Sequence, residues 1–298
     1  MTRTPPPAPP LAACLLALAL FGCDDKAKPP PAPPASGAPA SSAAPASSAA
    51  PPASNALPAS DLPASEAPAS SEAPASSAAP PASSTPPVPA ADFSFTPPGQ
   101  LHGSGAQGVT DSHIYVPGMR FPIQSPKAFA NSQVYGHGGM SGPGGGQCDP
   151  GNYVYPWHDN FCETRGYTTA LCPSGKGHQG QDIRPNSCAA ATYVTVAAEA
   201  GTITAIGPYI VHLVTPGGRD YLYLHMQMDK LKVKVGDHVA RGQPMGLVSN
   251  NFGGTATTIH LHFEIKQPVT HNGATITTRV PPYTSLLDSY QRMLAGTP

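Results

Sequence analysis

The sequence predicts an all-β domain: a mainly antiparallel sheet, followed by one short helix near the C-terminus. From residue 192 onward, short runs of β-branched and aromatic residues are separated by Gly, Pro, Asp and Asn, which are typical of turns between strands. No helical periodicity alternates with these runs, so we expect neighbouring strands to be antiparallel. The predicted strands are Tyr193–Ala198, Thr202–Ile206, Ile210–Thr215, Tyr221–Leu224, Leu231–Val235, Met245–Ser249 and Ile259–Ile265. Helical spacing occurs once in this part of the chain, at Leu286, Leu287, Tyr290, Met293 and Leu294.

The N-terminus has the pattern of an export signal. Arg3 is followed by an apolar run from Leu11 to Phe21, which is too short to span a bilayer as a mature helix. Leu20-Phe21-Gly22-Cys23 resembles the lipobox of bacterial lipoproteins, in which the cysteine is lipidated and becomes the new N-terminus. We therefore expect residues 1–22 to be a lipoprotein signal peptide. The lipid on Cys23 would anchor the exported protein to the inner or the outer bacterial membrane, facing the periplasm or cell envelope. An ordinary secretory signal that is cut nearby is the alternative.

Residues 23–92 are predicted to be a disordered tether that starts at the lipidated cysteine. Between residues 29 and 91 the sequence is almost entirely Pro, Ala and Ser, and Asp61, Glu66 and Glu72 are its only charges. Such a composition cannot bury enough apolar surface to offset the loss of chain entropy. The folded part is expected to begin with a lead-in segment at 93–118, followed by one domain at 119–298. The whole chain of 298 residues has a formal charge of −1 and no basic block, which argues against a nucleic-acid partner.

Four cysteines lie in the predicted domain: Cys148, Cys162, Cys172 and Cys188. An even number of cysteines in an exported chain predicts two disulfides, and the sequence leaves all three pairings open. A second zinc site is the alternative, but no Cys-x-x-Cys spacing supports it. The segment at about residues 132–172 is rich in glycine and has no clear period. We expect it to be an insert that the disulfides hold, or one that forms the wall of a binding groove.

Two short histidine motifs predict a metal site. His178 and Asp182 are four residues apart and His260 and His262 are two apart, so each pair lies on one face if its segment is extended. Imidazoles and a carboxylate are the ligands that a catalytic zinc ion takes, with a fourth position left open for water. Strand alternation does not distinguish His260 from His262 as the metal ligand, because both side chains point to the same side.

These motifs belong to a longer series that resembles a known family. His178-x-Gly-x-Asp182, Tyr223-Leu-His225, Val235-Gly-Asp-His-Val-Ala-Arg-Gly-Gln243 and His260-Leu-His-Phe-Glu264 occur in the order seen in lysostaphin/LytM-type zinc endopeptidases. The resemblance covers Met119 to about Lys266, apart from the segment between about residue 132 and Cys172.

The resemblance implies a compact β-sheet domain with an open groove, one catalytic Zn²⁺ ion, and cleavage of peptide bonds in peptidoglycan stems or cross-bridges. By position, His178, Asp182 and His262 correspond to the zinc ligands of that family, and His225 and His260 correspond to its catalytic histidines. The expected partners are therefore peptidoglycan as the substrate and the membrane through the N-terminal lipid. The oligomeric state is not predicted.

Two further residues are candidates for supporting the site. Glu264 shares a face with His260 and His262, so its carboxylate can either orient a histidine or form a surface salt bridge. Tyr223 shares a face with His225 in the predicted strand Tyr221–Leu224, and the two leucines of that strand are expected to face the core.

Two other functions agree with parts of the sequence. A non-catalytic LytM-type module that activates a cell-wall amidase would share the fold and the lipid, but such modules have lost metal residues that are all present here. Val233–Gly246 also resembles the hammerhead of biotinyl or lipoyl carrier domains and adaptors, which implies a barrel-sandwich-like element. A carrier domain needs a modifiable lysine at the tip of a hairpin, and Asp229-Lys230 is a poor match to that pattern.

Overall fold

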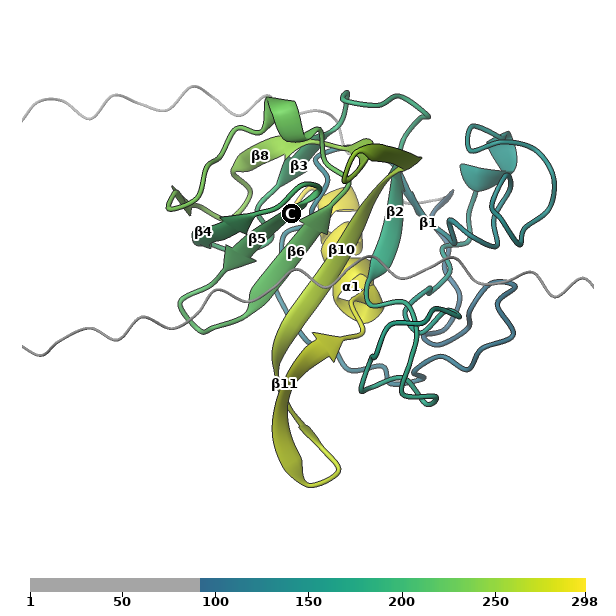
Figure 1. The fold of residues 1–298 in the computed structure, drawn as a ribbon, viewed down its shortest axis with the longest axis horizontal. Coiled ribbons are helices and arrows are strands. Elements are labelled where there is room, and N and C mark those ends of the chain that lie inside the picture. Colours follow the sequence, from purple (N-terminus) through teal and green to yellow (C-terminus); the bar gives the residue numbers. More distant parts are fainter. Residues whose placement is uncertain (1–91) are drawn as a thin grey trace, which may run out of the picture. The chain divides into compact units, whose positions relative to one another are not determined.

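The computed structural model describes residues 92–298, whose fold is shown in Figure 1. The predicted signal peptide, the lipidation site Cys23 and nearly all of the tether fall in residues 1–91, outside the described residues. Across residues 92–298, no helix has both the length and the apolar character needed to cross a membrane.

The described residues form a nine-stranded sheet and a two-stranded sheet, and all strand pairs are antiparallel. The large sheet has the order β1-β2-β10-β6-β5-β4-β7, with β9 and β11 paired to parts of β10, and the small sheet consists of β3 and β8. The prediction of an all-β domain with one short C-terminal helix is confirmed. The strands are β1 Ala128–Ala130, β2 Gln181–Pro185, β3 Val194–Val196, β4 Gly201–Ile206, β5 Ile210–Val214, β6 Asp220–Leu224, β7 His238–Val239, β8 Pro244–Leu247, β9 Ser249–Phe252, β10 Thr255–His271 and β11 Ala274–Val280.

Strand β10 organises the large sheet. It pairs with β2 on one side and with β6 on the other, and His262 is opposite Asp182 in β2 and opposite Leu224 in β6. Its side chains alternate between two faces: Leu261, Phe263 and Ile265 are fully buried in the core, and the intervening histidines and Glu264 lie on the other face. The alternation therefore separates the apolar core from a polar face.

The core side of β6 differs from the prediction. Tyr221 and Tyr223 are fully buried, with Tyr223 packed edge-on against Phe263. Leu222 is also buried, but it lies on the opposite face, beside Glu264 of β10, where Leu224 is only partly buried. The expectation that the leucines face the core was wrong, because alternation shows which residues share a face but not which face is inside. The tyrosines can be buried because both hydroxyls have partners, Glu199 for Tyr221 and the Ala198 amide for Tyr223.

The predicted C-terminal helix is α1, Tyr283–Leu294, which packs on the core face of the sheet. The ring of Tyr290 in α1 lies against Trp157 and Phe93, with centroid distances of 4.4 and 4.8 Å. Trp157 is fully buried and donates a hydrogen bond from Nε1 to the Ala128 carbonyl at 2.8 Å. The only tryptophan therefore anchors the predicted insert to the core, and Phe93 packs the start of the lead-in segment against the same helix.

Two local predictions differ from the structure. Leu231–Val235 is not a strand; it follows the 3₁₀ turn η3 (Met228–Lys230) and leads into a turn in which the Lys234 amide donates to the Asp237 side chain. Its apolar residues are explained by burial of Val233 in the core. The β10–β11 hairpin was not predicted, although Asn272-Gly273 at its tip has the positive φ angles (51° and 78°) that this dipeptide adopts in tight hairpin turns.

The segment at about residues 132–172 contains one 3₁₀ turn, η2 (Pro150–Asn152), and is otherwise irregular. Its cysteines form the disulfides Cys148–Cys188 and Cys162–Cys172, which confirms the prediction of two disulfides and gives their connectivity. One bridge ties the segment to the loop after β2, and the other closes a loop just before His178.

Loss of the two disulfides is expected to have unequal effects on stability. Replacing Cys148 and Cys188 by serine opens a link between residues 40 positions apart, which should lower the free energy of unfolding by about 4 kcal/mol. The pair Cys162 and Cys172 is only 10 positions apart, and the smaller restriction of the unfolded chain gives about 3 kcal/mol. Denaturant unfolding of the two double-serine variants checks both values; wild-type stability in either variant would contradict the prediction.

Candidate metal centre

The candidate site lies where β2, β6 and β10 run side by side in the sheet (Figure 1). His178 precedes β2, Asp182 lies within β2, and His260 and His262 lie within β10. His225 directly follows β6. All five side chains line one groove on the polar face of the sheet, so the fold brings together every residue that the sequence predicted as a ligand or a catalytic histidine.

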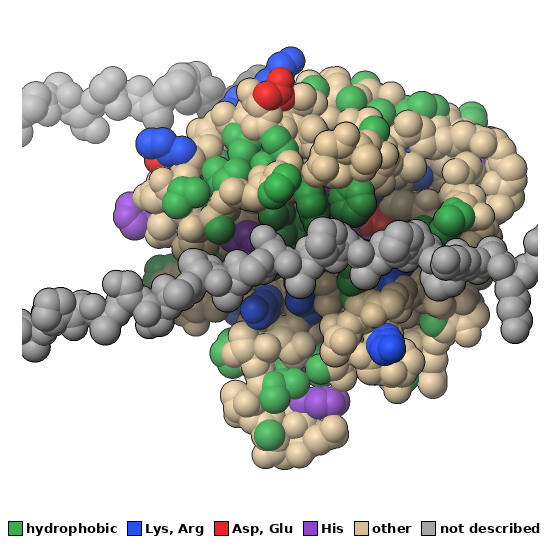
Figure 2. All heavy atoms as spheres, in the orientation of Figure 1, with side chains coloured by type: hydrophobic (Ala, Val, Ile, Leu, Met, Phe, Trp, Pro, Cys, Tyr) green, Lys and Arg blue, Asp and Glu red, His purple; other side chains and the backbone are tan. Residues whose placement is uncertain are grey.

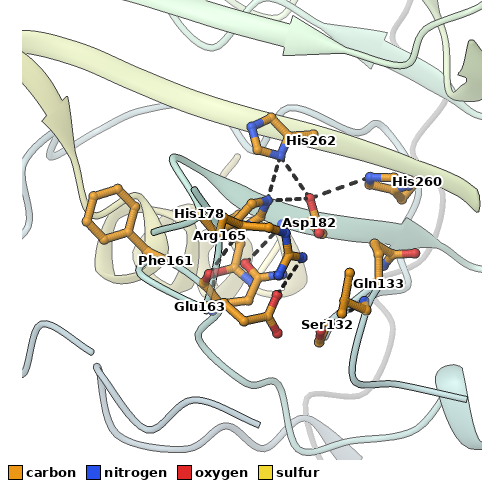
Figure 3. Close-up of polar contacts among 12 residues, drawn as sticks. Ser132, Gln133, Phe161, Glu163, Arg165, His178, Asp182, His260 and His262 are labelled. Atoms are coloured by element: carbon orange, nitrogen blue, oxygen red, sulfur yellow. Dashed lines mark hydrogen bonds and ion pairs between the residues drawn. The ribbon is translucent and has the colours of Figure 1, made fainter. Parts of the chain in front are cut away.

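Three of these residues offer ligand atoms that converge on one point (Figure 3). His178 Nε2 lies 3.0 Å from His262 Nδ1 and 3.4 Å from Asp182 Oδ1, and His262 Nδ1 lies 2.9 Å from the same oxygen. Ligand atoms placed 2.0–2.1 Å from a tetrahedral zinc ion are about 3.3 Å apart, so the three separations match such a site. His260 approaches this group only at 3.5 Å from Asp182, which favours His262 as the ligand.

The tautomers of the two ligand histidines follow from their outer contacts. His178 Nδ1 lies 2.9 Å from the carbonyl oxygen of Asn160, which can only accept, so this nitrogen carries the hydrogen. His262 Nε2 lies 2.9 Å from the carboxylate of Glu264 and donates in the same way. The inward nitrogens of both rings are therefore the ones that can take up a proton or bind a metal ion, and they face each other and a carboxylate oxygen. Two imidazole nitrogens and a carboxylate oxygen at these distances are a donor set that fits zinc.

The pKa shifts of His262 and Asp182 show that the centre stabilises positive charge. Burial lowers the pKa of His262, but its hydrogen bonds to the Asp182 and Glu264 carboxylates outweigh that effect and raise the pKa to about 9. Burial would raise the pKa of Asp182, but His178 and His260 hold it well below its usual range. A carboxylate that stays ionised beside a strongly basic imidazole is suited to a divalent ion.

His225 and His260 form a second pair on the wall of the groove, with ring centroids 4.7 Å apart. Each has Nδ1 at 2.8 Å from a backbone carbonyl, that of Asn251 for His225 and that of Thr258 for His260. Burial lowers the pKa of both rings, to about 3 for His225, where the neighbouring His260 and His262 add to the effect. Both imidazoles are therefore neutral near pH 7, with an unprotonated Nε2 available in the groove.

The backbone at His225 departs from strand geometry. Its φ angle is 68°, in the left-handed region that non-glycine residues seldom adopt, and its amide donates to the Tyr209 carbonyl at 3.0 Å. The change of backbone direction at the end of β6 places the ring beside His260, instead of continuing the alternation of Tyr221 and Tyr223. Positive φ angles at non-glycine residues are concentrated at functional sites.

The two candidate supporting residues have different positions. Glu264 is buried, orients His262 through Oε1 and forms an ion pair with Arg279 through Oε2. Tyr223 does not support the site: its ring lies on the core face with Phe263, opposite to His262, and its hydroxyl accepts a hydrogen bond from the Ala198 amide at 2.8 Å. The prediction that Tyr223 supports the site assumed that Tyr223 and His225 point to the same face of one strand. The turn at His225 ends that strand, so the two side chains do not share a face.

Two further residues position the ligands and were not found from the sequence. Asn160, in the irregular segment, accepts from His178 Nδ1 through its carbonyl and from the Asp182 amide through its side chain. Gly180 allows β2 to approach β10, because a Cβ atom there would lie 2.5 Å from the Phe263 carbonyl oxygen and 2.8 Å from His262 Nε2. The central glycine of the His178-x-Gly-x-Asp182 motif was a signal for this close approach, whereas no sequence pattern points to Asn160.

Replacing Glu264 by glutamine is expected to weaken zinc binding about 10- to 100-fold. The glutamine oxygen can still accept from His262 Nε2, but it lacks the charge that makes the opposite nitrogen a stronger donor to the metal. Competition with a chromophoric chelator measures the change in Kd. Glu199→Gln is the matched control, because Glu199 also pairs with an arginine but lies outside the groove. Unchanged affinity in Glu264→Gln would contradict the assigned role.

Comparison with known proteins gives matches to peptidases. Residues 176–277 match the model of Peptidase family M23, a span that contains all five predicted site residues and Glu264. Over 90 residues, the chain is 34% identical to Protease LasA from two strains of Pseudomonas aeruginosa, which is 28% of this chain and 20% of each protease. The chain thus spans about a fifth of the length of these curated relatives.

Solved structures of peptidases are also similar to this chain. The catalytic domain of the antimicrobial peptidase lysostaphin from Staphylococcus simulans aligns with a TM-score of 0.33 and 24% identity, covering 43% of this chain and 89% of that domain. A zinc-containing peptidase from Vibrio cholerae aligns with a TM-score of 0.26 and 24% identity, covering 34% of this chain and 29% of that protein.

Proposed function

We propose that this protein is a zinc-dependent endopeptidase that cleaves peptide bonds in peptidoglycan stems or cross-bridges. The observation that carries the proposal is the convergence of three candidate ligand atoms, from His178, Asp182 and His262, in a groove that also presents two neutral histidines. The match of residues 176–277 to Peptidase family M23 supports peptide-bond hydrolysis as the reaction. The names of the similar proteins, a protease and an antimicrobial peptidase, support the same class of activity.

Zinc held by His178, Asp182 and His262 would lower the pKa of a water molecule toward 7 and polarise the scissile carbonyl. The protein's own groups then have to move protons. Because His225 and His260 are neutral and each presents an unprotonated Nε2, either can accept a proton from the attacking water. The ring that has accepted it can donate it to the nitrogen of the leaving amine, which breaks the peptide bond. The carbonyl oxygens on both Nδ1 atoms keep the rings oriented during this transfer.

The predicted lipid on Cys23 belongs to the same proposal. A protein exported and anchored there would hold its groove within reach of peptidoglycan on a tether of about 70 residues, which spans up to roughly 210 Å if extended as polyproline II. Anchorage is tested by metabolic labelling with a fatty acid analogue, which should label the wild-type protein and not a Cys23→Ala variant.

Digestion of purified peptidoglycan sacculi tests the proposed reaction. The zinc-loaded full-length protein is expected to release fragments that carry new amino and carboxyl termini within stems or cross-bridges, as identified by mass spectrometry. Chelation should stop the release and added zinc should restore it. Sacculi that stay intact until a separate amidase is added would contradict the proposal and support the non-catalytic activator. Release of whole stem peptides by the protein alone would assign the cleavage to the amide bond between glycan and peptide.

A further inference from the structure

The groove has different chemistry at its two ends. Along β10, Thr257 lies near the aromatic side chains of Phe252 and Tyr209, the histidines follow, and Glu264 and Arg279 come after them. Arg165 lines the same groove from the loop closed by Cys162–Cys172. Figure 2 shows the face in the orientation of Figure 1, with hydrophobic side chains gathered in its upper half and Lys or Arg side chains both below them and at the upper edge. Along β10 the groove therefore runs from aromatic side chains near β9 to Glu264 and Arg279 near β11, and Arg165 lines it from the loop.

Each groove arginine is held by a buried carboxylate. Arg165 donates from Nη2 to Glu163 at 2.9 Å, and the Glu163 side chain is 0% exposed while that of Arg165 is 18% exposed. Arg279 pairs through Nε with Glu264, whose side chain is 5% exposed while that of Arg279 is 29% exposed. In both pairs the carboxylate fixes one nitrogen of the guanidinium, and in Arg165 a second nitrogen, Nη1, donates to the Thr164 carbonyl at 2.8 Å. This arrangement holds the cations in place before a ligand arrives, so less side-chain entropy is lost on binding.

The loop that carries Arg165 is fixed to the metal centre itself. The Cys162 amide donates to the His178 carbonyl at 3.0 Å, and the His178 amide donates to the Glu163 carbonyl at 2.8 Å. These two backbone hydrogen bonds set the distance between the arginine and a metal ligand (Figure 3). Arg279 is fixed in turn through Glu264, which contacts His262. Both arginines are thus positioned relative to the candidate metal ligands.

The charge balance favours an anionic group in this part of the groove. Arg165 and Arg279 are the only Lys or Arg residues lining the groove among residues 92–298. With a divalent ion bound, the ion and the two arginines outweigh the carboxylates of Glu163, Asp182 and Glu264 by one charge. A guanidinium matches a carboxylate with two parallel hydrogen bonds, so a carboxylate is the anion that this geometry suits.

We propose that Arg165 and Arg279 form a carboxylate-binding subsite beside the metal centre, so that the preferred substrate is a peptide with a free carboxylate next to the scissile bond. Such a carboxylate occurs in acidic peptidoglycan stems and is absent from the interior of a glycine bridge. The inference rests on the proposed endopeptidase function and assigns its substrate. Both arginines lie outside residues 176–277, so the subsite belongs to the disulfide-closed loop and the β10–β11 hairpin of this chain.

The test uses two synthetic cross-linked stem-peptide dimers that differ only beside the scissile bond, where one has free carboxylates and the other has carboxamides. The zinc-loaded full-length protein is expected to show a KM about 10-fold or more lower for the free-carboxylate dimer. Arg165→Gln and Arg279→Gln should each remove most of that preference, because each raises the KM of the free-carboxylate dimer more than that of the amidated dimer. Arg165→Lys and Arg279→Lys should restore it in part, because lysine keeps the charge without the two-pronged geometry.

Arg219→Gln is the matched control, since Arg219 is similarly exposed and paired with Glu199 but does not line the groove. It should keep the full preference. Zinc content is measured for every variant. If Arg279→Gln loses the metal because Glu264 is disturbed, the result for Arg165→Gln decides whether the subsite exists. Arg165 pairs with Glu163, which is not in contact with His262. Equal KM values for the two dimers in the wild type, or equal losses on both dimers in Arg165→Gln, would overturn the subsite.

Binding without turnover separates this inference from the proposed function. Fluorescence anisotropy with labelled dimers on the zinc-loaded His260→Ala protein is expected to show about 10-fold tighter binding of the free-carboxylate dimer. If the wild type cleaves neither dimer but binding keeps this preference, the proposed function fails and the subsite stands. If the protein binds the two dimers equally, or binds neither, the subsite is wrong whatever the activity of the wild type.

Discussion

Replacing His262 by alanine is expected to abolish stoichiometric zinc binding and to reduce peptidoglycan hydrolysis to the background rate. His262 Nδ1 lies 3.0 Å from His178 Nε2 and 2.9 Å from Asp182 Oδ1, so it completes the group of three candidate ligand atoms. Its removal leaves one imidazole and one carboxylate, too few to hold a catalytic zinc ion. Without the ion, the pKa of water is no longer lowered toward 7, and hydroxide is no longer available at neutral pH.

Metal analysis of the purified full-length variant, together with the rate of fragment release from sacculi, measures both effects. His212→Ala is a suitable control, because His212 pairs with Asp220 and does not line the groove. That variant should retain one zinc per chain and wild-type hydrolysis. Full zinc retention by His262→Ala would refute its assignment as a ligand.

Replacing His225 or His260 by alanine is expected to lower the hydrolysis rate by about 10²-fold or more while zinc content stays near that of the wild type. The reason is that their tautomers are fixed by backbone carbonyls, so each presents a proton-accepting Nε2 to the groove. Neither nitrogen belongs to the group of three ligand atoms. Proton transfer from the attacking water and to the leaving amine should therefore slow down without loss of the metal.

Single-turnover rates and zinc content of His225→Ala and His260→Ala check this division of roles. Loss of zinc from either variant would reassign that residue to the metal. Hydrolysis at the wild-type rate by a zinc-loaded variant would remove its residue from the mechanism. A double variant should lose little more than the worse single one if the two rings act on the same proton transfer.

Much of the strand pattern was predictable because it depends on local alternation and turn residues. Apolar residues at every second position correctly predicted the part of β10 at Ile259–Ile265. The helical spacing of apolar residues from Leu286 to Leu294 correctly predicted α1. The assignment failed where alternation alone could not decide, as on β6, where tyrosines with satisfied hydroxyls and not leucines face the core. The strand predicted at Leu231–Val235 is absent because a turn that buries one valine, Val233, has the same local sequence pattern as a strand.

The candidate ligands were predictable because they occur as close pairs on extended segments. Their partners were not, since they depend on tertiary contacts: Asn160, Glu163 and Arg165 lie in a segment without a period, where no pattern predicts direction. Arg279 lies on a hairpin that was missed despite the Asn272-Gly273 signal at its tip. The orientation of His225 could not be read from strand alternation, because its positive φ angle ends the strand pattern at that residue.

The central claim is that one zinc ion, held by His178, Asp182 and His262, enables this protein to hydrolyse peptide bonds in peptidoglycan. Titration of zinc into metal-free full-length protein, with new amino termini in sacculi measured at each step, tests it most directly. Hydrolysis should rise in proportion to added zinc and reach its plateau at one equivalent per chain. Full hydrolysis before any zinc is added, or no hydrolysis after the site is filled, would contradict the claim.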